Sequence, residues 1–149
     1  MQYRNITSDE QLREYCRELE AHPLAAFDTE FVSEHTFRPV LCLIQVAAGG
    51  ELAVIDTLCI EDLAPFWKTL AAEGRTTIVH SGRSEVEFSM QSIGLPPTGL
   101  FDVQIAAGLV GLEYPVGYGN LLLRVLGEKV KKHETRTDWQ RRPLSKKQI

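Results

Sequence analysis

The chain has 149 residues, of which 44% are hydrophobic and 24% charged, and its net charge is −4. This length supports one compact domain with a sizeable core and is too short for two domains of ordinary size. No apolar run is long enough to cross a membrane, and the start of the chain lacks the apolar core of a secretion signal. These features predict a soluble, cytoplasmic protein with no membrane partner.

Charge is distributed unevenly along the chain. Residues 124–149 carry nine Lys/Arg and three Asp/Glu, a balance of +6, which leaves −10 for the remainder. Such a basic end either binds a polyanion or forms an ordinary solvated terminus, and charge alone favours neither interpretation.

The three cysteines, Cys16, Cys42 and Cys59, lie in apolar or amphipathic surroundings and form no C-x-x-C pair. This pattern argues against disulfides, a structural zinc and a catalytic thiol. We therefore expect all three to be reduced core residues.

The predicted elements begin with an amphipathic helix after Thr7-Ser8-Asp9-Glu10, which has the form of a capping box from Thr7 to Glu10. Three apolar strands follow over residues 24–31, 40–48 and 52–56, and Gly49-Gly50 predicts a hairpin between the last two. Helix and strand then alternate, with helices near residues 62–74, 84–93, 103–112 and 121–126 and strands near residues 76–80 and 100–102. This order predicts an α/β protein whose mixed sheet is flanked by helices.

Two acidic residues stand at the end of the first strand, in the run Phe27-Asp28-Thr29-Glu30-Phe31. Side chains alternate along a strand, so Asp28 and Glu30 face one side and Thr29 and Phe31 the other. Two carboxylates on one face repel each other unless a cation joins them, and Mg²⁺ or Mn²⁺ prefers such oxygen ligands. The alternative is a pair of solvated acids at a strand end.

Further candidates gather where this pair lies, because active sites in such sheets form at the carboxyl ends of central strands. Glu85, in the first turn of the helix after His80, can aim at the site, whereas Glu87 faces solvent. Together these carboxylates would hold two metal ions that activate a water and stabilise the leaving oxygen of a phosphoryl displacement. His80 is either a general base or, more commonly, a structural residue at a strand end. Asp102 is better explained as the N-cap of the following helix.

Five segments resemble ribonuclease D in the same order along the chain, namely residues 27–31, 39–46, 80–83, 101–107 and 136–144. The resemblance covers nearly the whole chain. It implies a ribonuclease H-like fold and membership of the DEDD 3′–5′ exonucleases, in the branch whose third motif carries a tyrosine. The implied reaction is trimming of single-stranded RNA 3′ ends, with tRNA precursors as candidate substrates, by means of two divalent metal ions.

The same resemblance assigns roles to individual residues. It implies that Asp28 and Glu30 are first-motif metal ligands, with Asp28 bridging both ions, and that Glu85 replaces a second-motif aspartate. A glutamate there retains the charge and adds roughly 1.5 Å of reach. The third motif, a tyrosine followed four residues later by an aspartate, is expected just beyond Ile149. We therefore expect residues 1–149 to be one exonuclease domain that lacks its C-terminal part.

RNA contacts are expected from Thr29, Phe31, His80 and Arg136. Arg136 would hold the phosphate backbone, while Phe31, Phe37 or His35 would stack on terminal bases. The competing interpretations are core packing for the two phenylalanines and a structural clasp formed by the segment from Arg136 to Trp139. A domain that binds nucleic acid without catalysis is the alternative function.

Overall fold

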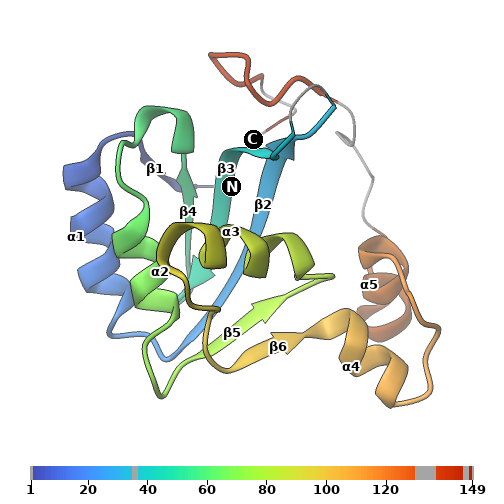
Figure 1. Ribbon diagram of the computed structural model, residues 1–149. Coiled ribbons are helices and arrows are strands. Elements are labelled where there is room, and N and C mark those ends of the chain that lie inside the picture. The colour runs from blue at the N-terminus through green and yellow to red at the C-terminus, as the bar shows by residue number, and fades with distance from the viewer. Residues whose placement is uncertain (1, 35–36, 130–136, 146–147, 149) are drawn as a thin grey trace.

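The computed structural model describes residues 2–34, 37–129, 137–145 and 148. Six strands form a mixed sheet in the order β1-β4-β3-β2-β5-β6 (Figure 1). The strands are β1 (Arg4–Ile6), β2 (Leu24–Val32), β3 (Val40–Ala48), β4 (Glu51–Ile55), β5 (Thr76–Val79) and β6 (Leu100–Asp102). Strand β3 is antiparallel to β2 and β4, whereas the pairs β1–β4, β2–β5 and β5–β6 are parallel. The predicted α/β class with a mixed sheet is confirmed.

The edge strand β1 is not predicted by the sequence. It has three residues, and Ile6 is the buried one among them. A strand this short offers no alternation that could be recognised. It pairs in parallel with β4, where Ile6 lies opposite Ile55, and this pairing carries Ile6 into the core.

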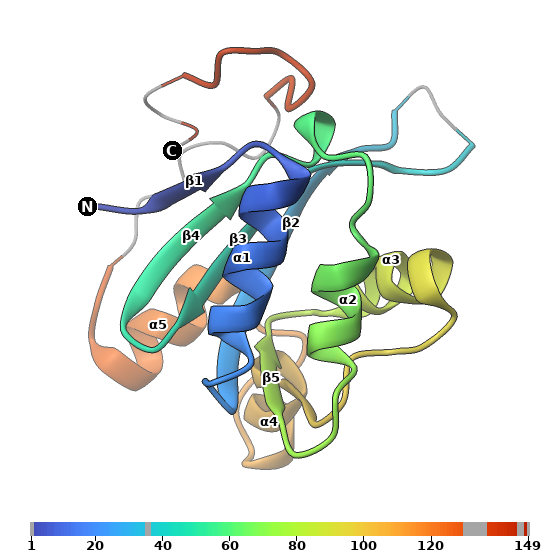
Figure 2. The same ribbon diagram turned by 90° about the vertical axis from the view of Figure 1, so that its left-hand side faces the viewer.

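Helices cover both faces of the sheet. Figure 2 shows α1 and α2 in front of the sheet and α5 behind it. Within the described residues the helices are α1 (Asp9–Leu19), α2 (Ala64–Leu70), α3 (Arg83–Ile93), α4 (Val103–Leu109) and α5 (Tyr118–Leu126), with a 3₁₀ turn η1 (Thr57–Cys59). None of these helices is long and apolar enough to cross a membrane.

Several helix boundaries differ from the predicted ones, among them both ends of α2, which spans Ala64–Leu70 where a helix near residues 62–74 is predicted. Helix α1 is capped by Ser8, whose hydroxyl accepts the Gln11 N–H at 3.3 Å, one residue beyond the predicted cap at Thr7. Helix α4 ends at Leu109, ahead of a turn in which Gly111 has a φ of 81°. Helix α5 begins three residues before the predicted position, because its first turn contains residues of low helix propensity that hide the periodicity.

The position of the α1 cap can be tested by substitution. Ser8→Ala should lower the free energy of unfolding by about 1 kcal/mol, because it leaves the Gln11 N–H without its side-chain acceptor. Thr7→Ala is the matched control and should cost little, since the backbone N–H of Thr7 keeps its 2.8 Å bond to the Gln11 side chain. Urea denaturation of both variants measures the difference. A larger loss of unfolding free energy in Thr7→Ala would instead support the cap at Thr7 that the sequence predicts.

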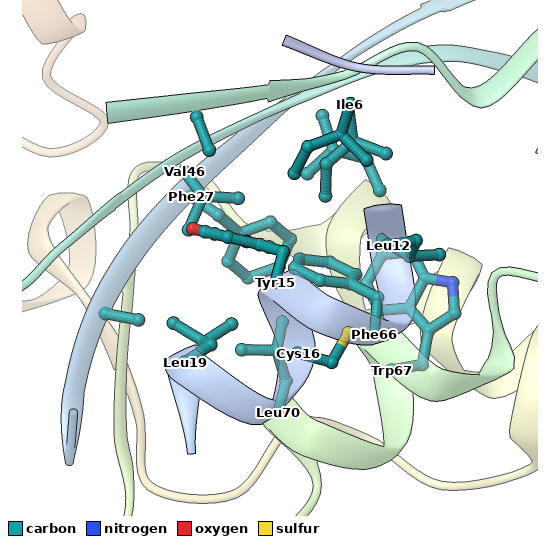
Figure 3. Close-up of a cluster of buried hydrophobic side chains, with 14 of the residues drawn as sticks. Ile6, Leu12, Tyr15, Cys16, Leu19, Phe27, Val46, Phe66, Trp67 and Leu70 are labelled. Atoms are coloured by element: carbon teal, nitrogen blue, oxygen red, sulfur yellow. The ribbon is translucent and has the colours of Figure 1, made fainter. Parts of the chain in front are cut away.

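The main core lies between the sheet and helices α1 to α3 (Figure 3). Phe27 of β2 packs edge-to-face against Phe66 and Trp67 of α2, with ring centroids 6.0 Å apart in both pairs. From α1, Leu12 and Leu19 are buried in the same cluster. The predicted apolar faces of both helices are therefore the buried ones. Because this face of β2 is filled, its remaining side chains project to the opposite face.

The cysteines are free, but only two of them belong to a core. Cys16 and Cys42 are buried, whereas Cys59 is exposed in η1. The expectation that all three are core residues is therefore wrong for Cys59. The 3₁₀ turn directs the neighbouring Ile60 inward instead, where it is 8% exposed.

Residues 137–145 cover part of the second face of the sheet. Trp139 is buried there against Cys42 and Leu43 of β3. Arg142 fixes the segment by donating to the Asp56 carboxylate at 2.5 and 2.6 Å and to the Cys42 carbonyl at 3.0 Å. A clasp is thus present, but Arg142 forms it, whereas Arg136, the residue considered from the sequence, lies outside the described residues.

Candidate active site

Asp28 and Glu30 lie on the same face of β2, as the alternation predicts. Ala25, Phe27 and Thr29 point into the core on the helix α1–α3 side and are buried, whereas Asp28 is exposed and Glu30 half-buried. The pair lies on an inner strand, because β2 is flanked by β3 and β5, and it stands beyond the residues 24–26 that pair with β5. A register shift against β3 falls immediately after Glu30. Such irregularities re-aim side chains and are frequent next to active sites.

The two carboxylates disfavour each other's charge. Burial raises the pKa of Glu30 to about 7, and the neighbouring Asp28 carboxylate adds to this effect. Partial loss of hydration also raises the pKa of Asp28, although a hydrogen bond from the Thr29 backbone and the charge of the nearby His80 oppose the shift. A divalent cation would relieve this repulsion, and two carboxylates are the hard oxygen donors that Mg²⁺ and Mn²⁺ select. The donor set of this chain therefore fits such a metal.

Glu85 lies close to the pair but its carboxylate is engaged elsewhere. It is the third residue of α3, is 5% exposed, and its Oε1 accepts a 2.6 Å hydrogen bond from the Thr29 hydroxyl. Burial raises its pKa, the Thr29 bond opposes this, and the charges of Asp28 and Asp102 raise it further. Among the residues that the structure describes, no three His, Cys, Asp or Glu side chains are grouped closely enough to hold a metal. The three predicted ligands are thus neighbours without forming a compact site.

Glu87 takes the place predicted for it. It is exposed on α3 and pairs with Arg83, one turn earlier, at 2.9 Å. Its carboxylate therefore faces solvent and does not belong to the candidate site.

His80 follows β5 and is half-buried. Its Nε2 lies 2.9 Å from the Val116 carbonyl, and because a carbonyl only accepts, Nε2 donates. The Gln104 side chain donates to the same carbonyl at 3.0 Å, and the Tyr118 ring packs edge-on against the imidazole at 5.5 Å. This arrangement matches the structural interpretation of His80 more closely than that of a general base.

The remaining residues expected at RNA occupy different environments. The Thr29 hydroxyl is committed to Glu85, and Phe31 packs edge-on against Phe88 with centroids 5.4 Å apart, in agreement with core packing. Phe37 is fully exposed, so core packing is wrong for this residue. Both Arg136 and His35 lie outside the described residues.

A cavity of about 1200 Å³ opens on the same face of the sheet as the carboxylate pair. Asp28 and His80 line it, together with apolar side chains of the sheet and of α4 and α5, among them Val103 and Leu122. The sequence does not predict this cavity, because it arises where helices distant in the chain stand over the sheet. Open space beside the carboxylates is what a polymeric substrate requires.

Asp102 caps α4 as predicted, accepting the Gln104 N–H at 2.9 Å. Sequence reasoning misses that the same carboxylate also accepts hydrogen bonds from Ser81 and Gly82. No sequence signal links residues so far apart, because the contact depends on the pairing of β5 with β6.

This combination of fold and acidic residues defines a class of nuclease. The family model described as 3'-5' exonuclease matches residues 3–149, and the chain belongs to this family. Within it the chain is similar to ribonuclease D. It is 36% identical over 145 residues to ribonuclease D of Nitrobacter hamburgensis, which covers 97% of this chain and 38% of that protein. With ribonuclease D of Escherichia coli the identity is 37% over 148 residues, covering 99% of this chain and 40% of that protein.

Solved structures agree with this placement. The crystal structure of Escherichia coli RNase D, an exoribonuclease involved in structured RNA processing, superimposes with a TM-score of 0.92 over 99% of this chain and 40% of that chain. Trypanosoma brucei RNase D in complex with RNA U12 shares the fold at 20% identity, with a TM-score of 0.81 over 97% of this chain and 55% of that chain. The chain therefore spans about two fifths of the length of the ribonuclease D relatives that it matches.

Proposed function

We propose that this domain removes nucleotides from the 3′ end of single-stranded RNA with the help of two divalent metal ions, Mg²⁺ or Mn²⁺. The observation that carries the proposal is the placement of Asp28 and Glu30 on one face of the central strand β2, with Asp28 lining an open cavity. Two carboxylates in this position have no cationic side chain among their hydrogen-bond or ion-pair partners within the described residues. A metal ion is therefore the natural partner.

Asp28 and Glu30 would hold the metal, and Glu85 would supply a third carboxylate from α3. When bound, two such ions would supply activation of a water and stabilisation of the leaving oxygen in an in-line displacement at phosphorus. Glu30 must be ionised to serve as a ligand, so its raised pKa means that protons compete with the metal and that metal affinity falls as the pH drops below 7. The Thr29 hydroxyl acts indirectly in this scheme, because it orients the Glu85 carboxylate.

The RNA end would enter the cavity beside Asp28. His80 and Tyr118 present an edge-to-face pair of rings there, and an unstacked terminal base can lie against such a surface. Arg136 and the basic residues near it would attract the phosphate backbone upstream. Processing of tRNA precursors is one substrate class that this proposal includes.

An assay on labelled RNA tests the proposal. The 149-residue chain is incubated with a 5′-labelled single-stranded RNA in Mn²⁺, Mg²⁺ or EDTA, beside DNA of the same sequence. We expect a metal-dependent ladder that shortens from the 3′ end and that Asp28→Asn abolishes, because the amide loses the charge that binds the metal. Glu87→Gln is the matched control and should leave the ladder unchanged, since Glu87 faces solvent.

A binding module without catalysis is the second candidate. It is favoured by the engagement of Glu85 with Thr29 instead of with the Asp28–Glu30 pair. In that case the RNA stays intact with either metal ion, but the protein binds it and slows its migration in a gel. Asp28→Asn changes neither result. Shortening of the DNA at an equal rate would contradict the assignment to RNA while leaving the exonuclease activity in place.

A further inference from the structure

Helix α3 starts without a side-chain cap of its own. Its N-cap is Gly82, which offers no side-chain acceptor, and the preceding Ser81 has a φ of 60°, in the left-handed region that residues with side chains seldom adopt. A Cβ at Gly82 would overlap the Val79 side chain, so the turn permits no larger residue. Something outside the helix must therefore hold this strained turn in place.

Asp102 supplies the missing acceptors. Its Oδ1 accepts the Ser81 N–H at 3.0 Å, and its Oδ2 accepts the Gly82 N–H at 2.9 Å. It can reach both because β5 and β6 are neighbouring strands (Figure 1). They pair in parallel, with Val79 directly opposite Asp102. One carboxylate thus satisfies the start of α3, 20 residues earlier in the chain, and the start of α4 together.

The charge of Asp102 suits this position. Burial alone would raise its pKa, but the backbone N–H groups of Gly82, Ser81, Gln104 and Ile105 outweigh this effect and hold the pKa below its usual range. The residue is therefore ionised at neutral pH. A negative charge in front of a helix start also interacts favourably with the helix dipole.

The consequence concerns Glu85, which lies in the first turn of α3. Its position depends on where α3 begins, and two contacts set this: the Asp102 tether through Ser81 and Gly82, and the direct Thr29 bond at 2.6 Å. If Asp102 only capped α4, one carboxylate oxygen would be enough, because Oδ1 accepts the Gln104 N–H. The other carboxylate oxygen, Oδ2, accepts the Gly82 N–H, and this bond has no function in the capping of α4.

We propose that Asp102 is a positioning residue that fixes the start of α3 and thereby the place of Glu85 against β2, the strand that carries Asp28 and Glu30. The functional part of this inference rests on the proposed metal-dependent activity, whereas the tether itself does not. A ligand-positioning group of this kind typically contributes 10–100-fold to metal affinity or activity.

Two substitutions separate the tether from the cap. Asp102→Ser retains a good N-cap for α4 but loses the oxygen that reaches Gly82. Asp102→Asn keeps one acceptor oxygen and places an NH₂ donor at the other position, so it should lie between Ser and the native residue. Ser8→Ala, at the distant α1 cap, is the matched control with a comparable loss of stability.

Amide hydrogen exchange of the 149-residue chain tests the tether without any metal. In Asp102→Ser we expect faster exchange at residues 83–89 relative to α1, and in Ser8→Ala the reverse. Equal exchange across both helices in the two variants would overturn the proposal. This readout is independent of the activity, so it stands even if the proposed function fails.

Calorimetric titration with Mn²⁺ tests the consequence for the site. We expect Asp102→Ser to bind Mn²⁺ roughly 10–100-fold more weakly than the native chain, with Asp102→Asn between them and Ser8→Ala unchanged. If Asp102 acts through Glu85, the loss disappears in a Glu85→Gln background, because coupled residues are not additive. Additive losses would overturn the proposed route through Glu85. Failure of the native chain to bind Mn²⁺ would contradict the proposed function. Faster hydrogen exchange in α3 of Asp102→Ser would then still support the tether, without its link to a metal.

Discussion

Arg142→Ala should lower the free energy of unfolding by roughly 3–5 kcal/mol, more than any surface substitution in this chain. The Arg142 side chain is 25% exposed and that of Asp56 only 10%, so most of the pair is shielded from water. Removing the guanidinium leaves Asp56 with the Leu58 N–H at 3.2 Å as its remaining partner. It also deprives the Cys42 and Trp139 carbonyls of their donor.

Chemical denaturation measures this loss, and two further variants define its origin. Arg141→Ala removes an exposed neighbouring arginine and should change stability by less than about 0.5 kcal/mol. Arg142→Lys retains the charge but not the planar fork that reaches Asp56 and a carbonyl together, so it should fall between these two. An Arg142→Ala variant as stable as Arg141→Ala would show that residues 137–145 are not held by this clasp.

Glu30→Gln should make the metal-free protein more stable at pH 8, by roughly 2 kcal/mol after allowance for partial exposure. The pKa of Glu30 in the folded protein is about 7, whereas its ordinary value is 4.5, so the folded state binds this proton more tightly. The stability contributed by protonated Glu30 is complete below about pH 4.5 and is lost as the pH rises through 7. Glutamine is never ionised and avoids that loss.

Unfolding in urea between pH 5 and pH 8, with EDTA present, measures this effect. The native protein should lose stability across the range relative to Glu30→Gln, while Glu87→Gln, at an exposed glutamate, should follow the native profile. Added Mn²⁺ should restore stability to the native protein at pH 8 and much less to Glu30→Gln, since a bound ligand stabilises the folded state. A Glu30→Gln variant that is less stable than the native protein at pH 8 would mean that folding does not raise the pKa of Glu30 in the absence of metal.

Local patterns were sufficient for most of the elements. The apolar runs of β2 and β3 and the apolar faces of α1 and α2 are long enough for their periodicity to be read directly. The misplaced features are short or depend on single hydrogen bonds, as with β1, the Ser8 cap and exposed Cys59. Strand β1 forms because it pairs with β4, a segment distant in the chain, whereas the choice of Ser8 over Thr7 as the cap depends on one local hydrogen bond to Gln11.

Some features of the candidate site likewise follow from local sequence patterns, whereas others depend on contacts between distant residues. Alternation along β2 determines that Asp28 and Glu30 share a face, and helical spacing determines that Glu87 points away from Glu85. Neither pattern indicates that Thr29 would engage Glu85 across 56 residues.

The sequence by itself determined the class of fold, the order of its main elements and the pair of carboxylates, because these follow from periodicities of two and 3.6 residues within one segment. Only the tertiary structure decided that Arg142 closes the clasp on Asp56 and that Asp102 joins the starts of α3 and α4. These contacts link residues 86 and 20 positions apart. Their geometry is set by which strands pair and by what the core excludes, and these are properties of the whole folded chain.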